Sequence, residues 1–561
     1  MTRLPFGYPE TEVPLRAQRD AAAVVDTEAA HKVEVGIPMR DGVELAADVY
    51  LPPAAARPAP AVVVGTPYNK DSSGADEEVA RFNDAGYALV RFDSRGRGKS
   101  EGEFQPFSMQ DGIDGHDVVE WIAGQDWCTG AVGIKGLSYP GWITMATVSQ
   151  KPPHLRAAIP ISAPGRWQQE IPYTHGCLQI FFAWWWALVR RRINDSLLGA
   201  PELLQILPVE AMGDVLRPAG GGWREMLEHE ALDELWRSRR WDGAYDFDVP
   251  CLHVTGWHDR EDIHGAFHHY EQMAATSPAR ERQWLLVGPW THVSCALPSD
   301  TFKGVRYPGG ALDAFAIQIR FFDRFLKGEE NGVDDEPRVQ LYDTGARSWQ
   351  VRPAWQGGTR EHRLYLAADG ALADAPGAGG ETSYRYDPLR PNGLEYPLDV
   401  LPLEPPLDLS GLEAQEGVVS WTSEPLAEPL TVHGWGELEL WAETDGDDVE
   451  WHAKLADVGP DGVPLWVGWG CLRASHADDP GAPAPVVPGE TRRYAVELTP
   501  AFHTFQPGHR LRLLLAGSEF PWFARNLNRF EPIATQSEPR VATNTVRFGS
   551  AHPSCVRLRV E

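Results

Sequence analysis

A serine in a glycine-rich turn is the first residue whose setting suggests chemistry. Ser138 lies in the sequence GLSYPG at residues 136–141, between a strand-like run at 132–135 and an apolar stretch at 142–148. This pattern is typical of a nucleophile elbow, in which a sharp strand-to-helix turn exposes a serine hydroxyl and aims backbone N–H groups at a nearby oxyanion. Pro140 stands where the commonest motif has its second glycine, so a helix start with an incidental serine is the alternative.

Two later segments supply an acid and a histidine in the chain order that such an elbow requires. Asp259 follows a strand-like run at 251–255, and His292 follows another at 284–287. A carboxylate there would accept the imidazole N–H and stabilise the imidazolium that forms when His292 takes the serine proton. Taken singly, Asp259 could cap a loop and His292 could be an ordinary loop histidine. Their joint order instead predicts a Ser138–His292–Asp259 triad.

Two tyrosines could complete this site as oxyanion donors. A tetrahedral intermediate needs about two hydrogen-bond donors at about 3 Å from its oxygen. Tyr68 follows an early strand-like run at 61–65, on the same rim as the triad, and its phenol could donate one hydrogen bond. The backbone N–H of Tyr139, next to Ser138, could donate the other. We predict this pair as the oxyanion hole, with rim packing as the alternative for Tyr68.

Aromatic side chains near these segments favour an apolar or aromatic pocket for the acyl group of a substrate. The residues predicted to line it are Trp142, Phe182, Trp185, Trp257 and His258. Aromatic residues in this part of the chain could equally serve only to pack a helical cap onto the core.

A histidine-rich and acidic stretch is a weaker candidate for a metal site. His264 and His268 are one helical turn apart and follow the carboxylates Glu261 and Asp262. The HExxH motif of metalloproteases is absent, because Gly265 stands where its glutamate would be. We therefore expect neither a metal ion nor an organic cofactor.

Composition excludes several classes of function. The 561 residues carry 51 Lys and Arg against 79 Asp and Glu, and the net charge of −28 would repel nucleic acids and anionic membranes. The longest apolar run, 180–189, is about half as long as a membrane span. No targeting segment is evident and the six cysteines form no C-x-x-C pair, so we expect a cytoplasmic protein with buried free thiols. The expected partner is a small-molecule substrate, and a homo-oligomer stays open.

The elements that must position these residues form an α/β core. Short apolar runs alternate with amphipathic stretches, which is typical of a mostly parallel sheet covered by helices. The strands are expected at 31–35, 43–51, 61–65, 87–92, 132–135, 157–161, 251–255 and 284–287. Apolar residues at helical spacing predict a helix around 118–122 and another over 312–326 that stops near Gly328.

Four segments are predicted along the chain. Residues 1–164 and 249–345 form the two parts of the core, and 165–248 form an inserted helical cap, with helices expected at 181–193 and 223–241 and no strand between them. Residues 346–561 lack helical periodicity and predict a β-sandwich or jelly roll. Its strands are expected at 364–366, 437–441, 451–455, 494–498, 511–515 and 556–560.

Together these motifs resemble the Xaa-Pro dipeptidyl-peptidase and cocaine esterase family of serine hydrolases. The motifs are TPYNK at 66–70, GLSYPG at 136–141, GWHD at 256–259 and GPWTH at 288–292, with KLADV at 454–458 and PGHR at 507–510 in the C-terminal part. The resemblance covers nearly the whole chain. It implies an α/β-hydrolase core, an inserted helical cap, a C-terminal jelly roll, no cofactor, and the triad and oxyanion hole given above. His258 departs from the tyrosine that relatives often have.

We therefore predict a serine hydrolase that cleaves carboxylic esters, or amides, of hydrophobic acyl groups through an acyl-enzyme. The main alternative is an Xaa-Pro dipeptidyl-peptidase, which needs a buried carboxylate for the substrate ammonium; Glu170 and Asp195 qualify only by their position. An acyltransferase and a non-catalytic binding protein are further alternatives. With an ordinary His292 pKa of about 6.5, activity should rise between about pH 6 and 8.

Overall fold

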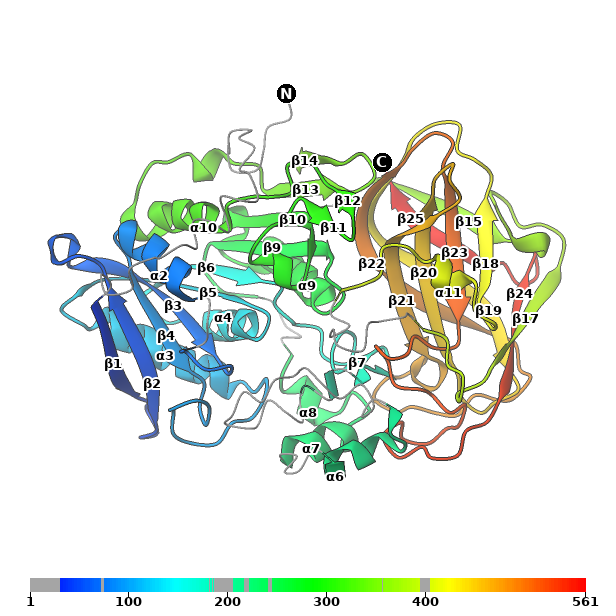
Figure 1. Ribbon diagram of the computed structural model, residues 1–561, viewed down its shortest axis with the longest axis horizontal. Helices are drawn as coiled ribbons and strands as arrows, with labels where there is room; N and C mark the ends of the chain where they lie inside the picture. Colours follow the sequence, from blue (N-terminus) through cyan, green and yellow to red (C-terminus); the bar gives the residue numbers. More distant parts are fainter. Residues whose placement is uncertain are drawn as a thin grey trace.

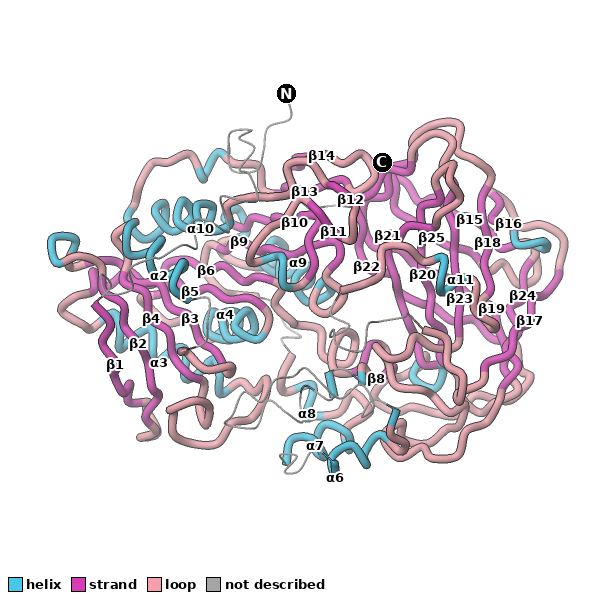
Figure 2. The backbone as a smooth tube through the Cα atoms, viewed as in Figure 1, coloured by secondary structure: helices cyan, strands magenta, loops and turns pink. Residues whose placement is uncertain are grey.

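Two β-rich bodies lie side by side in the computed structural model, with short helices beneath their junction (Figure 1). One body mixes helices and strands, and the other consists almost wholly of strands and loops (Figure 2). None of the helices that are described is long and apolar enough to cross a membrane. The structure describes residues 31–71, 75–180, 182–183, 185, 205–215, 221–240, 245–355, 357–393 and 404–561.

The core sheet has ten strands within the described residues, in the order β1-β2-β4-β3-β5-β6-β9-β10-β13-β14. The strands from β4 to β13 run parallel, and antiparallel strands flank them at both edges. Every core strand predicted from the sequence is present. The bounds are His31–Pro38, Glu44–Leu51, Ala59–Thr66, Ala88–Asp93, Cys128–Leu137, Leu155–Ile161, Cys251–His258, Gln283–Thr291, Val339–Asp343 and Ser348–Arg352 for β1, β2, β3, β4, β5, β6, β9, β10, β13 and β14.

Helices pack on this sheet and on one another. α2 (Ala75–Asp84) and α10 (Ala314–Phe322) lie together, while α3 (Gln110–Ala123) packs on α4 (Tyr139–Ser149). Gly112 and Gly115 permit the second contact, because a Cβ on either would come within 2.4 Å of α4 atoms. α10 continues as a π-helical turn and ends at Gly328, whose φ of 73° is left-handed, as the sequence predicted.

The segment between β6 and β9 contains short elements. A hairpin of β7 (Tyr173–Thr174) and β8 (Cys177–Leu178) is a feature that the sequence did not predict, since no strand was expected there. The helix predicted over 181–193 lies almost wholly outside the described residues. The one predicted over 223–241 contains two short helices. The helices of this segment are α6 (Met212–Val215), α7 (Gly221–Glu228) and α8 (Glu234–Arg237).

The C-terminal domain is all-β, as predicted, and eleven described strands form its sheet. The fifteen-residue strand β19 organises it, because it pairs with β22, β24 and β25. All six predicted strands are present. The bounds of β15 to β25 are Arg360–Leu366, Ala371–Ala373, Gly380–Tyr386, Val419–Ser423, Leu430–Thr444, Glu450–Val458, Pro464–Arg473, Arg492–Phe505, Arg510–Ala516, Ala542–Phe548 and Cys555–Val560.

The predicted boundary between residues 345 and 346 divides a β-hairpin. β14 follows that boundary, yet it pairs antiparallel with β13 at the edge of the core sheet. The sequence analysis placed this strand in the C-terminal domain because helical periodicity ends before it. A strand at the edge of an α/β sheet carries no helical signal of its own.

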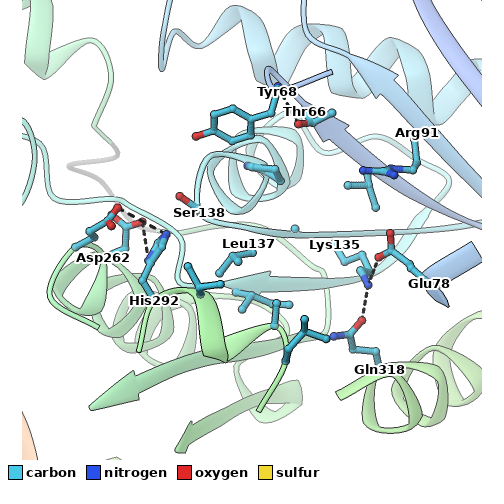
Figure 3. A pocket seen from close by; sticks show the side chains of 18 of the residues that line it. Thr66, Tyr68, Glu78, Arg91, Lys135, Leu137, Ser138, Asp262, His292 and Gln318 are labelled. Atoms are coloured by element: carbon cyan, nitrogen blue, oxygen red, sulfur yellow. Dashed lines mark hydrogen bonds and ion pairs between the residues drawn. The ribbon is translucent and has the colours of Figure 1, made fainter. Parts of the chain in front are cut away.

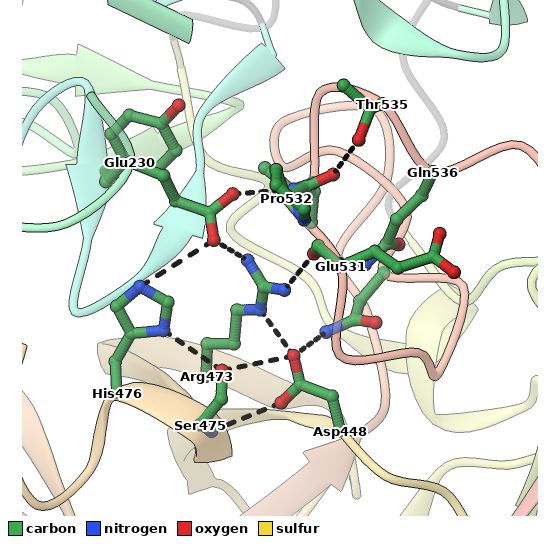
Figure 4. Close-up of polar contacts among 12 residues, drawn as sticks. Glu230, Asp448, Arg473, Ser475, His476, Glu531, Pro532, Thr535 and Gln536 are labelled. Atoms are coloured by element: carbon green, nitrogen blue, oxygen red, sulfur yellow. Dashed lines mark hydrogen bonds and ion pairs between the residues drawn. The ribbon is translucent and has the colours of Figure 1, made fainter. Parts of the chain in front are cut away.

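Buried ion pairs join the C-terminal domain to the cap region (Figure 4). The Arg473 guanidinium on β21 donates to Glu230 at 2.6 Å, to Asp448 at 2.6 Å and to the carbonyl of Glu531 at 2.8 Å. Arg473 is fully buried, so each of its charged partners offsets its desolvation. This network fixes the segment after α7 against the β-domain.

Candidate active site

Ser138 lies in a strained turn between β5 and α4. Its φ of 65° and ψ of −125° are unusual for a residue other than glycine, and its N–H donates to the carbonyl of Ile161 at 3.0 Å. A Cβ on Gly136 would come within 2.4 Å of the Pro140 backbone, and one on Gly141 within 2.8 Å of the Ile161 carbonyl oxygen. Pro140 is tolerated because it stands in the first turn of α4. The local sequence therefore produces the elbow.

Asp259 and His292 follow the neighbouring parallel strands β9 and β10. The His292 Nδ1 lies 3.2 and 3.3 Å from the two Asp259 carboxylate oxygens. Asp259 Oδ1 also accepts the backbone N–H groups of Glu261 at 3.0 Å and Asp262 at 3.2 Å. These contacts orient the carboxylate toward the imidazole, as the second member of a triad requires.

A cavity of about 460 Å³ brings the predicted residues together. Ser138, Tyr68 and His292 line it, and in Figure 3 the serine hydroxyl lies between the tyrosine ring and the imidazole. At its other end the Lys135 ammonium is paired with Glu78 at 2.5 Å. The cavity thus contains a serine hydroxyl, an imidazole and a phenol, with a neutralised ion pair at its far end.

The two predicted oxyanion residues are placed differently. Burial and the nearby Glu261 carboxylate raise the pKa of Tyr68, so its hydroxyl stays protonated as a donor. The Tyr139 side chain is buried, where its hydroxyl donates to Asp111 at 2.8 Å and accepts the Phe107 N–H at 2.7 Å. Only the backbone N–H of Tyr139, in the first turn of α4, can serve an oxyanion.

Two of the five predicted substrate-binding residues line the cavity. Phe182 and Trp185 do so together with Phe107, and the rings of Phe182 and Trp185 stack with centroids 5.0 Å apart. They form an apolar wall beside the serine. An aromatic or aliphatic acyl group would fit against this wall.

The structure places the other three predicted residues elsewhere. Trp142 is fully buried and its indole donates to Asp111 at 3.2 Å, while the Trp257 indole donates to the Tyr342 carbonyl at 2.7 Å. The His258 ring packs on Phe302 with centroids 4.7 Å apart. None of the three is among the residues that line the cavity. Proximity in sequence to the triad does not determine which side of its element a side chain occupies.

Sequence reasoning assigned two further carboxylates, Glu261 and Asp262, only to a weak metal-site candidate and not to the cavity with Ser138. Glu261 and Asp262 line the cavity with Ser138 and are 6% and 2% exposed. Glu261 Oε2 lies 3.7 Å from His292 Nε2, and Asp262 Oδ2 lies 3.8 Å from Nδ1. Their position two and three residues after Asp259 was the available signal, since the loop that carries the acid must also reach the cavity.

These charges perturb one another. Burial lowers the pKa of His292, but Glu261, Asp259 and Asp262 outweigh it and hold that pKa well above its ordinary value. Burial and the Asp259 charge raise the pKa of Glu261 to about 7, and burial with neighbouring carboxylates raises that of Asp262 further. Burial also raises the pKa of Asp259, but the His292 charge and hydrogen bonds bring it below its ordinary value. The expected activity rise between pH 6 and 8 therefore moves to higher pH.

Glu170, one of the two carboxylates considered earlier, has a structural role. It is buried and accepts the N–H groups of Gly165 at 3.0 Å, Arg166 at 3.1 Å and Gly265 at 2.5 Å. These bonds tie the segment after β6 to helix α9 (Ile263–Thr276). Asp195 lies outside the described residues.

The C-terminal domain holds the loop that carries the acid. Arg260, between Asp259 and Glu261, is paired with Glu519, and its guanidinium lies 4.2 Å from the Trp522 ring centroid. Glu519 is also paired with Lys454 on β20. All three charged groups are buried, so the loop is fixed by partners from a separate domain.

Fold and site together define a serine hydrolase with an α/β-hydrolase core and an all-β C-terminal domain. The model of the X-Pro dipeptidyl-peptidase (S15 family) matches residues 41–294, and that of the X-Pro dipeptidyl-peptidase C-terminal non-catalytic domain matches residues 331–557. Cocaine esterase of Rhodococcus sp. (strain MB1 Bresler) is 28% identical to this chain. The alignment is 578 positions long, gaps included, and covers 94% of this chain and 98% of that protein. The chain belongs to the Xaa-Pro dipeptidyl-peptidase and cocaine esterase family, as its motifs predicted.

Solved structures share this architecture. An α-amino acid ester hydrolase superimposes with a TM-score of 0.85 and 26% identity, covering 96% of this chain and 98% of that one. An aminopeptidase from the marine sediment archaeon Thaumarchaeota archaeon gives a TM-score of 0.87 at 24% identity, with 99% and 98% covered. The second similarity concerns the fold alone. The predicted fold, family and serine ester hydrolase activity are confirmed.

Proposed function

We propose that this enzyme hydrolyses esters of α-amino acids with hydrophobic or aromatic side chains. The observation that carries the proposal is the presence of Glu261 and Asp262 in the cavity with Ser138 and His292. Two buried carboxylates there would hold a substrate ammonium, which an ordinary ester lacks. The similarity to an α-amino acid ester hydrolase over 96% of the chain supports the same substrate class.

The proposed mechanism is acyl transfer in two steps. Ser138 attacks the ester carbonyl while His292 accepts its proton, and Asp259 stabilises the imidazolium. The Tyr68 hydroxyl and the Tyr139 N–H donate to the oxyanion. His292 then protonates the leaving alcohol, and a water molecule activated by the same imidazole hydrolyses the acyl-enzyme.

Two walls of the cavity would contact different parts of the substrate. Glu261 and Asp262 would receive the α-ammonium, while Phe107, Phe182 and Trp185 would contact the side chain of the acyl group. Hydrogen bonds to charged groups contribute about 1.5 to 3 kcal/mol each. One such contact therefore favours the amino ester by roughly 10- to 150-fold over the ester without the amino group.

An Xaa-Pro dipeptidyl-peptidase is the second candidate. The carboxylates of Glu261 and Asp262 could equally hold the N-terminal ammonium of a dipeptide, which is the feature that the sequence analysis did not find. Hydrolysis of an Ala-Pro anilide faster than of a matched amino ester would support this alternative. An acyltransferase would share the acyl-enzyme, and product partition with an added alcohol or amine would reveal it.

A matched pair of substrates tests the proposal. We expect kcat/KM for phenylglycine methyl ester to exceed that for phenylacetic acid methyl ester by at least about tenfold. Glu261→Gln should remove most of this preference. Glu78→Gln, the same change at the far end of the cavity, should retain it because Glu78 lies away from Asp262 and His292 (Figure 3). Equal kcat/KM values for the two esters in the wild-type enzyme would disprove the proposed substrate class.

The proposed partner is a small-molecule ester or amide, with a second copy of this chain as a further candidate. The cytoplasm is the proposed compartment, which agrees with six cysteines that are all free and buried.

A further inference from the structure

We propose that a divalent transition-metal ion, with zinc as the chief example, binds Glu261, Asp262 and His292 and reversibly blocks the enzyme. One carboxylate oxygen from each acid and one imidazole nitrogen all lie within 4.8 Å of one another. Two carboxylates and a neutral imidazole are ligands that zinc accepts, with a fourth position left for water.

Ligand atoms are available for such an ion. Glu261 Oε1 and Asp262 Oδ1 are buried and have no hydrogen-bond partner, although both side chains line the cavity. Tetrahedral zinc with bonds of about 2.0 to 2.2 Å places its ligand atoms about 3.4 Å apart. Glu261 Oε2 and His292 Nε2 are 3.7 Å apart, so small side-chain rotations would bring them to that separation.

The local charge favours a cation. Asp259, Glu261 and Asp262 surround a single imidazole, while the guanidinium of Arg260 is paired with Glu519 instead. A doubly charged ion would offset the mutual repulsion of these carboxylates.

An ion from solvent can reach the cluster. Val293 and Leu297 line the same cavity and are 52% and 64% exposed, so the cavity opens to the surface at this rim. The described residues contain a second cluster of potential metal ligands, which consists of Cys177, Glu450 and His452. This cluster is buried and does not line the cavity. It serves as an internal comparison for the test.

The ligand set predicts which ions bind. An imidazole nitrogen with two carboxylates suits zinc, copper, nickel and cobalt ions. Magnesium and calcium prefer six or more oxygen ligands, most of which this cluster does not offer. Zinc should therefore bind at concentrations at which magnesium does not.

Binding would inhibit by occupying the base. A metal-bound Nε2 cannot accept the Ser138 proton, and ligated Glu261 and Asp262 cannot receive a substrate ammonium. Inhibition by the ion rests on the proposed function of His292, Glu261 and Asp262. Binding of the ion does not depend on that proposed function. Inhibition should be competitive with an amino ester and reversed by a chelator.

Calorimetric titration of zinc into the Ser138→Ala enzyme tests binding without turnover. We expect one ion per chain, and at least about tenfold weaker binding in Glu261→Gln and in Asp262→Asn, because loss of even an outer-shell partner costs 10- to 100-fold. Glu78→Gln should bind as tightly as the parent. Absence of zinc binding, or binding that persists in both variants and disappears in His452→Ala, would overturn the proposal.

Kinetics separate this inference from the proposed substrate. Zinc should inhibit the wild-type hydrolysis of phenylacetic acid methyl ester, and EDTA should restore it. Equal turnover of amino and non-amino esters with intact zinc binding would disprove the substrate class and leave the metal site in place. A clear amino-ester preference without zinc binding would disprove the metal site alone.

Discussion

Replacing Glu261 with glutamine should shift the pH dependence of catalysis toward acid. In the proposed mechanism activity requires neutral His292, so it rises as pH increases through the pKa of this imidazole. Glu261 is the largest of the neighbouring charges that raise that pKa. Its removal lowers the His292 pKa, and the enzyme should become active at lower pH. Asp259 and Asp262 still face the imidazole, so part of the elevation remains.

The separation of the two groups sets the size of this shift. At 3.7 Å, two unit charges interact by about 4 kcal/mol at an effective dielectric constant of about 20, equivalent to roughly three pKa units. Glu261 has a raised pKa of about 7, so it is only partly ionised near neutrality. Water in the cavity weakens the interaction further. We expect the acid limb to move by at least about one pH unit.

The assay is kcat/KM between pH 4 and 10 with phenylacetic acid methyl ester, whose lack of an amino group keeps substrate titration out of the profile. This quantity reports the ionisation of the free enzyme. Glu78→Gln provides the control, because Glu78 lies at the far end of the cavity from His292 (Figure 3), and its acid limb should move much less than that of Glu261→Gln. An acid limb that does not move in folded Glu261→Gln enzyme would refute the electrostatic reasoning.

Three other substitutions test the site and its support. Ser138→Ala should abolish labelling by a fluorophosphonate while leaving the Tm unchanged, and Asp259→Asn should lower kcat about 10⁴-fold in a folded enzyme. Tyr68→Phe should cost about 2.7 to 4 kcal/mol of transition-state stabilisation, measured as a 10²- to 10³-fold loss of kcat with little change in KM. Glu519→Gln leaves Arg260 without its buried partner and should lower the free energy of unfolding by about 3 to 5 kcal/mol, measured with urea; a loss below 1 kcal/mol would contradict the role of this pair.

Much of the core could be predicted because its signals are local. Apolar runs marked the buried parallel strands from β3 to β10, although not β13, and the turn around Ser138 carries glycines that its geometry demands. The chain order of serine, acid and histidine then placed Asp259 and His292 after adjacent strands. The contact between these two side chains followed from the parallel arrangement of β9 and β10.

Other features depend on tertiary contacts that periodicity does not encode. Trp257 and His258 are next to the acid in sequence, yet their rings pack on other elements. Glu261 and Asp262 were considered only as part of a weak metal-site candidate, but the loop turns them into the cavity. The edge strand β14 was assigned to the wrong domain because its partner β13 is only visible in three dimensions.

The pairing of Arg260 with Glu519 has a consequence for recombining members of this family. Consider a chimera with the catalytic half of this chain and the β-domain of a relative that has a neutral residue at the position of Glu519. In this chimera the guanidinium of Arg260 would be buried next to Asp259 without the carboxylate of Glu519. Chimeras of this family should therefore take the residues at positions 260, 454 and 519 from the same parent protein. The two halves have to be exchanged together with these charges, because Arg260 of the catalytic half is paired with Glu519 across the domain boundary.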